Sequence, residues 1–335
     1  MRAVKVAAQA GLENLEVVEL SEPRGPRDGE IQVRVHASSL NYHDYGVAKR
    51  GDPKHVGRIL MADGAGIVTA VGAGVAEFKA GDSVVSTFYP TWLDGPPTQG
   101  DFSTVPGDGV DGYACEVVVR PASWFTRAPK GYSHVEAATL TTAGLTAWRA
   151  LIGDGLLKAG DTVLVLGTGG VAIFALQIAK AMGAVVAVTS SSDEKLAHAR
   201  KLGADHTINY KSEPEWGAAV QRWAQGRGVD HVIELGGPGT LAQSIAATRV
   251  GGHISLIGTL TGGSGQVPTA AMMIKHIRLQ GLIVGSRRQQ QQMIQGLEST
   301  GIRPVIDRSF PLERLADAFR YEESGRHFGK IGVEF

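Results

Sequence analysis

The sequence predicts an α/β fold in which a β-rich part accompanies a doubly wound parallel sheet. In the first 128 residues, short apolar or alternating runs such as Ile31-Gln-Val33-Arg-Val35 are separated by glycine, proline and aspartate, which is typical of β-strands. From about residue 160 to 285, strand-like and helix-like segments alternate, as they do where helices connect the strands of a parallel sheet. The length of 335 residues suits two domains.

The β-rich part is expected to contain short strands at residues 4–8, 16–19, 31–37, 66–71, 83–87 and 115–119. Residues 89–112 lack periodicity and hold four prolines, so we expect a long loop at a functional edge. Near residue 130 the pattern changes. Ser133 precedes an apolar run and Glu136 follows three positions later, which predicts a capped helix start.

The alternating part is expected to contain strands at 162–166, 185–189, 206–209, 232–235, 253–257 and 279–284, with helices at 171–182, 193–202, 215–225 and 239–248. The strand at 279–284 is expected at a sheet edge, where it can pair across a two-fold axis, so we expect a homodimer. After residue 286 we expect two amphipathic helices and a strand-like end. The run Gln289–Gln292 is expected on a solvated helix face.

Composition excludes several classes of function. The 33 basic and 33 acidic side chains balance, which gives no reason to expect a nucleic-acid partner. The first residues show no apolar core followed by a cleavage site, and no run of 18 apolar residues occurs, so we expect a cytoplasmic protein without a membrane segment. The one cysteine, Cys115, excludes an intramolecular disulfide and a cysteine-rich zinc lobe. We interpret it as a half-buried strand residue.

The most informative stretch is Leu164-Val165-Leu166-Gly167-Thr168-Gly169-Gly170-Val171-Ala172. An apolar strand runs into Gly-x-Gly-x-x-Ala, and a helix follows directly. Gly167 allows a sharp turn, and Gly169 removes a side chain where a pyrophosphate must approach the backbone. The free N–H groups at the start of the helix, at Gly170 and Val171, suit the phosphates. The sequence therefore predicts a dinucleotide site, with a glycine-rich turn of no function as the alternative.

The end of the next strand indicates which dinucleotide binds. NAD sites usually carry an acidic residue there, whereas this strand ends in serines and a lysine follows. We interpret Ser190, Ser191 and Lys195 as a 2′-phosphate site and predict NADP(H) as the cofactor. The alternative is that the serines cap a helix and the lysine is solvated, which would leave NAD(H) open.

Further segments resemble the medium-chain dehydrogenase/reductase superfamily, namely residues Gly64–Val75, Phe78–Val84, Thr142–Ala147, Lys201–Asp205 and Gly325–Lys330. The resemblance covers essentially the whole chain. It implies a GroES-like catalytic domain built from residues 1–129 and 285–335, and a Rossmann NADP(H)-binding domain at 130–284.

One branch of that superfamily uses catalytic zinc, held by Cys, His and Cys. When the motifs of that branch are matched to this sequence, the three ligand positions hold Asn41, Ala62 and Thr142, and none of these is a good zinc ligand. The loop that holds four cysteines in many of those enzymes has none here. We therefore expect no metal. An improvised site from His43, Asp44, His55 and Asp63 is conceivable, but the two aspartates are expected to make hydrogen bonds that order the loop.

The zinc-free branch is more similar. It includes NADPH:quinone oxidoreductases and enone reductases, whose Asn followed three residues later by Asp matches Asn41 and Asp44. Lys195 and Tyr210 match positions that hold the 2′-phosphate in that branch. The full set of expected cofactor contacts is Thr142, Thr146, Gly167, Gly169, Gly170, Val171, Ser190, Ser191, Lys195, Tyr210, Leu235, Gly258, Thr259, Val284, Gly285 and Lys330.

Reduction without a metal requires another way to stabilise negative charge on the substrate oxygen. The candidate donors are the Asn41 amide and the hydroxyls of Tyr42 and Tyr45, although each can serve only to pack or to order its loop. We interpret His43 as a surface or loop histidine. Three functions stay open: a zinc-free NADPH reductase of quinones or activated enones, a zinc-free carbonyl reductase or alcohol dehydrogenase, and an NADPH-binding protein without catalysis.

Overall fold

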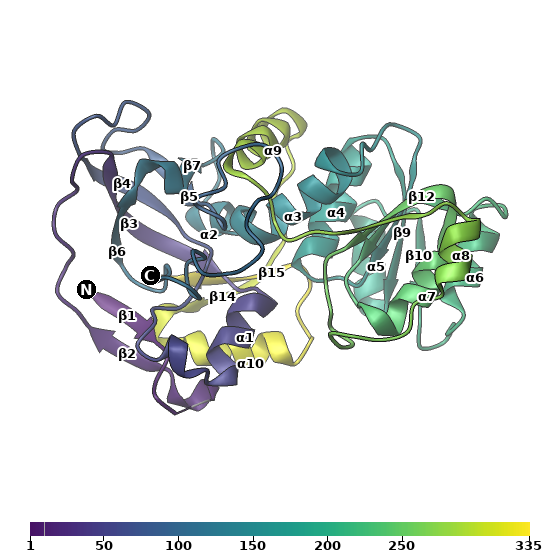
Figure 1. The fold of residues 1–335 in the computed structure, drawn as a ribbon, viewed down its shortest axis with the longest axis horizontal. Coiled ribbons are helices and arrows are strands. Elements are labelled where there is room, and N and C mark those ends of the chain that lie inside the picture. Colours follow the sequence, from purple (N-terminus) through teal and green to yellow (C-terminus); the bar gives the residue numbers. More distant parts are fainter. Residues whose placement is uncertain (10) are drawn as a thin grey trace. The chain divides into compact units, whose positions relative to one another are not determined.

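The protein is described from a computed structural model, in which residues 1–9 and 11–335 are described (Figure 1). The chain divides into two compact units. Unit 1 contains Met1–Leu145 and Val284–Phe335, and unit 2 contains Thr146–Ile283. Among the described residues, no helix is both long and apolar enough to cross a membrane.

The main sheet of unit 1 draws its strands from both ends of the chain. Its order is β14 (Ile306–Pro311), β15 (Lys330–Glu334), β3 (Glu30–Ser39), β4 (Ala65–Val71), β5 (Ser83–Ser86) and β7 (Phe125–Arg127), and β6 (Val117–Pro121) also pairs with β3. β15 runs antiparallel to β3 and parallel to β14. A separate ribbon is formed by β1 (Arg2–Lys5) and β2 (Glu16–Glu19). The helices of this unit are α1 (Tyr42–Arg50), α2 (His134–Ala138), α9 (Arg287–Thr300) and α10 (Leu315–Glu323).

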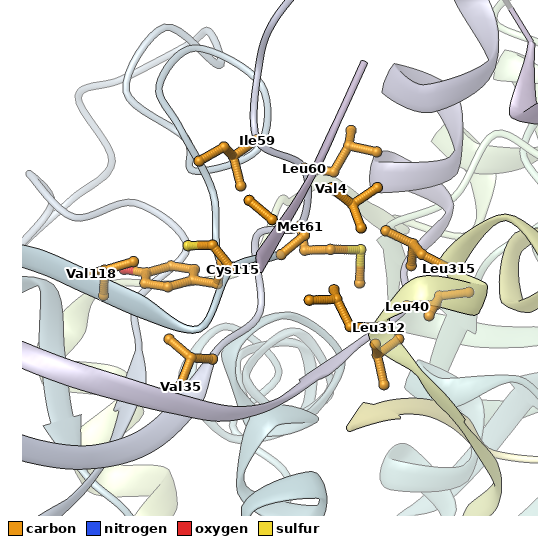
Figure 2. Packing of buried hydrophobic residues seen from close by; sticks show 14 of the residues in the cluster. Val4, Val35, Leu40, Ile59, Leu60, Met61, Cys115, Val118, Leu312 and Leu315 are labelled. Atoms are coloured by element: carbon orange, nitrogen blue, oxygen red, sulfur yellow. The ribbon is translucent and has the colours of Figure 1, made fainter. Parts of the chain in front are cut away.

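The core of unit 1 joins segments that are far apart in the sequence. Figure 2 shows Val4 of β1, Val35 of β3, Cys115, and Leu315 of α10 within one apolar cluster. Cys115 is fully buried rather than half-buried, and burial raises the pKa of its thiol to about 12. A thiol with such a pKa stays protonated at neutral pH, which makes it a packing residue.

Unit 2 has a parallel sheet in the order β10 (His206–Asn209), β9 (Val185–Ser190), β8 (Thr162–Leu166), β11 (Val229–Glu234), β12 (Thr248–Leu256) and β13 (Arg278–Gly281). The helices of this unit are α4 (Gly170–Ala181), α5 (Asp193–Lys201), α6 (Trp216–Trp223), α7 (Pro238–Ala247) and α8 (Thr269–Ile274). The short helix α3 (Leu145–Trp148) starts at Leu145 in unit 1 and continues into unit 2. The order reverses direction between β8 and β11, as in doubly wound dinucleotide-binding sheets. β13 lies at the sheet edge, as expected.

Two further sequence expectations differ from the structure. Residues 130–145 were expected in the cofactor domain, but they belong to unit 1, because α2 packs on the sheet of that unit at β3, β4 and β15. The run Gln289–Gln292 was expected to be solvated, but Gln290 is fully buried. Its Nε2 donates to the Ser86 carbonyl at 2.9 Å and to Thr126 Oγ1 at 2.8 Å. Polar composition alone does not show which glutamine of a helix faces inward.

Candidate active site

The Asn41 motif lies where β3 ends and α1 begins, and a buried carboxylate organises it. Asp63 has no exposed surface. Its Oδ2 accepts hydrogen bonds from Ser39 Oγ at 2.6 Å and Asn41 Nδ2 at 2.9 Å, and its Oδ1 accepts one from Thr142 Oγ1 at 2.6 Å. Thr142 belongs to a π-helical turn, Leu140–Gly144, a distortion often found at functional sites.

A buried ammonium, that of Lys330, completes this group of side chains, which we call the Asp63 cluster (Ser39, Asn41, Asp63, Thr142 and Lys330). Lys330, the first residue of β15, is 3% exposed. Its Nζ donates to the Leu40 carbonyl and, at 2.7 Å, to Asn41 Oδ1, and it lies 3.6 Å from Asp63 Oδ2. The side-chain network therefore fixes the orientation of the Asn41 amide, since only its oxygen can accept from the lysine and only its nitrogen can donate to the carboxylates. In this structure Lys330 holds the Asn41 motif, and the cofactor contact expected of it stays a prediction.

Two further carboxyl groups surround this ammonium. Burial, together with the charge of Asp63, raises the pKa of Asp44 to about 7. Asp44 Oδ1 accepts from the backbone N–H of Ala62 at 2.9 Å, and its Oδ2 accepts from Asn41 Nδ2 at 3.1 Å. Burial likewise raises the pKa of Glu322 to about 8. The sequence expectation that Asp44 orders its loop agrees with these contacts, whereas sequence reasoning did not find Glu322, which lies more than 270 residues away along the chain.

The donor set does not fit zinc. The positions that carry zinc ligands in the metal-dependent branch hold an amide, a methyl group and a hydroxyl, and the amide of Asn41 and the hydroxyl of Thr142 already bond to Lys330, Asp44 and Asp63. An ammonium beside this cluster also repels a second cation. Across residues 1–9 and 11–335, no group of three or more His, Cys, Asp or Glu side chains is arranged to hold a metal ion.

The two candidate tyrosines of α1 have different surroundings. The hydroxyl of Tyr45 donates to Glu323 Oε1 at 2.6 Å and accepts from Lys49 Nζ at 2.6 Å, so a surface ion pair occupies it. Tyr42 is 45% exposed, and within the described part of the chain its hydroxyl has no hydrogen-bond partner. Burial of part of the ring raises the pKa of Tyr42. Both N–H groups of Asn41 point to carboxylates, so of the three candidates only Tyr42 presents an unengaged donor.

A second polar cluster near α1 was not anticipated. His43 lies in α1 and packs between Phe88 and Phe102, with ring centroids at 5.5 and 4.6 Å, so it is not the surface or loop histidine expected from the sequence. Its Nε2 lies 3.4 Å from Asp108 Oδ2, and Asp108 Oδ1 lies 2.7 Å from Nε2 of His55. Burial lowers the pKa of His43 to about 4, so this imidazole is neutral at physiological pH. Asp108 comes from the long loop at 89–112, which the sequence placed at a functional edge.

The dinucleotide fingerprint in unit 2 has the expected local geometry. Gly167 directly follows β8 and has a φ of +79°, a left-handed conformation that favours glycine. Gly169 is the N-cap of α4, and no side chain caps this helix. The first N–H groups of α4, from Gly170 and Val171 onward, are therefore available for phosphate oxygens.

The end of β9 carries the residues predicted for the 2′-phosphate. Ser190 is its last residue, and the backbone N–H of Tyr210 donates to the Ser190 carbonyl at 3.1 Å, which brings Tyr210 next to this strand end. The nearest acid, Asp193, accepts from Asn209 Nδ2 at 2.9 Å. No carboxylate thus occupies the strand-end position that binds a ribose hydroxyl in NAD sites. Ser191 follows directly, and Lys195 lies in the first turn of α5.

The turn after β11 depends on a residue that sequence reasoning missed. Glu234 is fully buried, and its carboxylate accepts from the N–H groups of Gly236 and Gly237 at 2.8 and 3.0 Å. This holds the loop at Leu235 against Gly258, where a Cβ would lie 2.1 Å from the Leu235 carbonyl. Leu235, Gly258 and Thr259 are thereby gathered beyond the carboxyl ends of β11 and β12. The signal in the sequence that could have indicated this contact is an acidic residue, Glu234, at the end of an apolar strand.

The remaining expected cofactor contacts divide between the units. Thr146 is buried at the start of unit 2. Thr142, Val284, Gly285 and Lys330 belong to unit 1, and Thr142 and Lys330 are already engaged in the Asp63 cluster.

Comparison with known proteins identifies the family. Residues 27–130 match the family model of the alcohol dehydrogenase GroES-like domain, and residues 170–299 match that of zinc-binding dehydrogenases. A zinc-type alcohol dehydrogenase-like protein of Schizosaccharomyces pombe is 43% identical over 333 residues, which are 96% of this chain and 95% of that protein. The chain is a member of the medium-chain dehydrogenase/reductase superfamily.

Solved structures of the superfamily support the same assignment. A structure named as an NAD-dependent alcohol dehydrogenase has a TM-score of 0.90 at 34% identity, with all of both chains covered. A quinone oxidoreductase of Pseudomonas syringae pv. tomato has a TM-score of 0.83 at 27% identity, covering 100% of this chain and 99% of that one. The expected fold class and superfamily are confirmed, and the chain is an oxidoreductase of this superfamily. The names of these relatives state different substrates, an alcohol or a quinone, and only some of them mention zinc.

Proposed function

We propose that this protein is an NADPH-dependent reductase that passes a hydride to a quinone or an activated enone without a metal. The observation that carries the proposal is the Asp63 cluster. Of the three zinc-ligand positions, Asn41 and Thr142 are bonded to Lys330, Asp44 and Asp63, and the third is Ala62. Without a Lewis acid, the substrate must itself accommodate the charge left by hydride transfer. Quinones and enones do so because their reduced anions are delocalised.

The residues present fit a nicotinamide dinucleotide. The uncapped start of α4 suits its pyrophosphate, and Ser190, Ser191, Lys195 and Tyr210 suit a 2′-phosphate better than a ribose hydroxyl. The bound nicotinamide supplies the hydride. Glu234 keeps the loop after β11 in place for this ligand by its bonds to two backbone N–H groups.

The chain's own residues then have separate tasks. Tyr42 donates a hydrogen bond to the substrate oxygen as negative charge builds there. Asn41 is a positioning residue, because its donors are used by carboxylates and it ties the start of α1 to Lys330. A quinone or enone takes its final proton from water.

A second candidate is a zinc-free carbonyl reductase or alcohol dehydrogenase. The exposed hydroxyl of Tyr42 favours it, since a simple ketone requires a positioned proton donor that a quinone does not. A homodimer and a cytoplasmic location also stay predictions.

The test is NADPH oxidation by chelator-treated protein, with a quinone, an enone and a simple aldehyde assayed side by side. Turnover of the quinone or enone and not the aldehyde supports the proposal. Aldehyde turnover that survives the chelator supports the second candidate. Activity that EDTA abolishes and zinc restores would overturn the zinc-free assignment. NADPH binding without turnover of any acceptor would support a binding protein without catalysis.

The cofactor assignment has its own test. Lys195→Ala is expected to weaken NADPH binding by about tenfold or more and to leave NADH binding nearly unchanged, because only NADPH carries the 2′-phosphate. Fluorescence titration with both cofactors measures this. Lys201→Ala, at the other end of α5, is the matched control. Equal losses for both cofactors in Lys195→Ala would contradict the 2′-phosphate site.

A further inference from the structure

Unit 2 contains a recess of about 260 Å³ that no part of the dinucleotide fingerprint lines. Asp161, just before β8, borders it, as do His231 of β11, His253 of β12 and Arg278 of β13. The fingerprint follows the carboxyl end of β8, whereas Asp161 directly precedes β8 and Arg278 is the first residue of β13. Because the strands are parallel and His231 and His253 lie in register with Arg278, the recess lies toward the opposite end of β8 from the fingerprint.

Strand register places three titratable side chains in one row. His231 is the register partner of His253, and His253 is the partner of Arg278. Partners in a parallel sheet point to the same face, so these side chains project together into the recess. The two imidazole rings are 6.2 Å apart between centroids.

The imidazoles are buried and incompletely hydrogen-bonded. His253 is 5% exposed, and within the described residues neither of its ring nitrogens has a partner. His231 is 7% exposed; its Nδ1 has no partner and its Nε2 lies 3.2 Å from Asp161 Oδ2. Buried polar atoms are normally satisfied by protein, water or a ligand. Three such nitrogens beside one recess therefore indicate a group that the chain does not supply.

The charges around the recess favour an anion. Asp230 already accepts from Arg249 Nε at 2.5 Å and from Arg227, and Asp161 accepts from Lys158 Nζ at 2.6 Å. Both carboxylates are thus neutralised by basic partners. Arg278 donates to the backbone carbonyl of Asp154, and no carboxylate pairs with it in the described chain. Its charge is left for a ligand.

We infer that this recess is a second binding site, specific for a small oxyanion of the phosphate or carboxylate type, held by Arg278 and the imidazoles of His253 and His231. Its volume suits a group of a few heavy atoms and is below that of pockets for drug-sized ligands. The inference is independent of the reaction that the protein catalyses.

Binding is coupled to proton uptake. Burial, with the positive charge of Arg278, lowers the pKa of His253 to about 4, and burial also lowers that of His231. An anion next to these rings opposes both effects and favours their charged forms. The other charged groups facing the recess are Lys158, paired with Asp161, and Arg249, paired with Asp230. Affinity is therefore higher at pH 6 than at pH 8.

The test is calorimetric titration with sodium sulfate, whose charge is constant over this pH range, at fixed ionic strength. Saturating nicotinamide dinucleotide is present to block the fingerprint. We expect saturable binding of one sulfate per chain, weaker by up to about tenfold at pH 8 than at pH 6. Sodium acetate and inorganic phosphate are then compared to separate the carboxylate from the phosphate type.

Arg278→Gln is expected to weaken sulfate binding by about tenfold or more, and Arg222→Gln, on the exposed face of α6, to leave it unchanged. Unchanged dinucleotide affinity shows that the variants are folded. In the wild type, NMR titration of the histidine C–H signals is expected to show two imidazole pKa values rising with sulfate. Absence of saturable binding would overturn the inference. Equal sulfate binding by Arg278→Gln and the wild type would mean an adventitious ion only and would also overturn it.

Discussion

Replacing Lys330 by methionine tests the buried cluster of unit 1 most directly. The change keeps an unbranched side chain of similar length but removes the ammonium that bonds to Leu40 and Asn41 and lies 3.6 Å from Asp63. Loss of one partner of a buried charge pair costs about 3–5 kcal/mol, because the remaining charge stays buried. For a unit of this size, that corresponds to a fall in Tm of about 6–20 °C.

The stability lost in Lys330→Met depends on pH, and the direction of that dependence is set by Asp44 and Glu322. Their pKa values are raised to about 7 and about 8, so both are largely protonated at pH 6 and charged at pH 9. At pH 6 the variant leaves these two carboxyls mainly neutral, whereas at pH 9 it leaves both charged without their cation. In the folded state both groups hold protons at pH values where the unfolded chain has released them, so stability falls as pH rises through this window. The loss is therefore larger at pH 9.

Differential scanning calorimetry at pH 6 and pH 9 measures both quantities. Lys49→Met is the matched control, since its ammonium pairs with Glu323 at the surface and an exposed ion pair contributes about 0–1 kcal/mol. A loss below about 1 kcal/mol for Lys330→Met, or a loss that is the same at both pH values, would refute the reasoning.

Three further changes address other parts of the chain. Tyr42→Phe should lower kcat for the enone by about tenfold or more. Tyr45→Phe should change kcat by less than about twofold, because the Tyr45 hydroxyl donates to Glu323. Steady-state rates that fall equally in the two variants would contradict the role of Tyr42. Glu322→Gln should gain stability relative to the wild type as pH rises from 5 to 8, by at most about 1.4 kcal/mol per pH unit, because the folded wild type keeps a proton on Glu322 that its unfolded chain releases. A difference in urea-unfolding free energy that is independent of pH would count against this. Gln290→Leu should cost about 1–3 kcal/mol by thermal unfolding, with exposed Gln292→Leu near zero, and similar values for the two would show that the buried amide contributes nothing.

Much of the fold followed from local patterns. Most strands and helices of unit 2 lie within a few residues of their expected ranges, because each has an apolar run between glycine-rich turns, whereas α8 was not expected. Gln290 and His43 were misplaced for a common reason. Both are polar residues whose burial depends on partners from distant segments, Ser86 and Asp108, and no short window of sequence shows those contacts.

The candidate site was predictable in its motif but not in its electrostatics. Spacing pointed to Asn41 and to Asp44, and the glycine pattern pointed to the start of α4. The pairing of Asn41 with Lys330 depends on β15 lying beside β3, a long-range antiparallel contact. The same contact gives Lys330 a structural role in addition to the cofactor contact that its motif had suggested, which stays a prediction.

The placement of β15 between β14 and β3 also has a consequence for how the protein is made. During synthesis, unit 2 leaves the ribosome as one continuous stretch and can fold while translation proceeds. Unit 1 must wait, because residues 330–334 insert into the middle of its sheet. Until they arrive, β3 has an open edge and three buried carboxyls lack their cation. The nascent N-terminal half is therefore the segment most exposed to aggregation and to chaperones, and a ribosome stalled shortly before residue 330 would hold a folded unit 2 beside an unfinished unit 1.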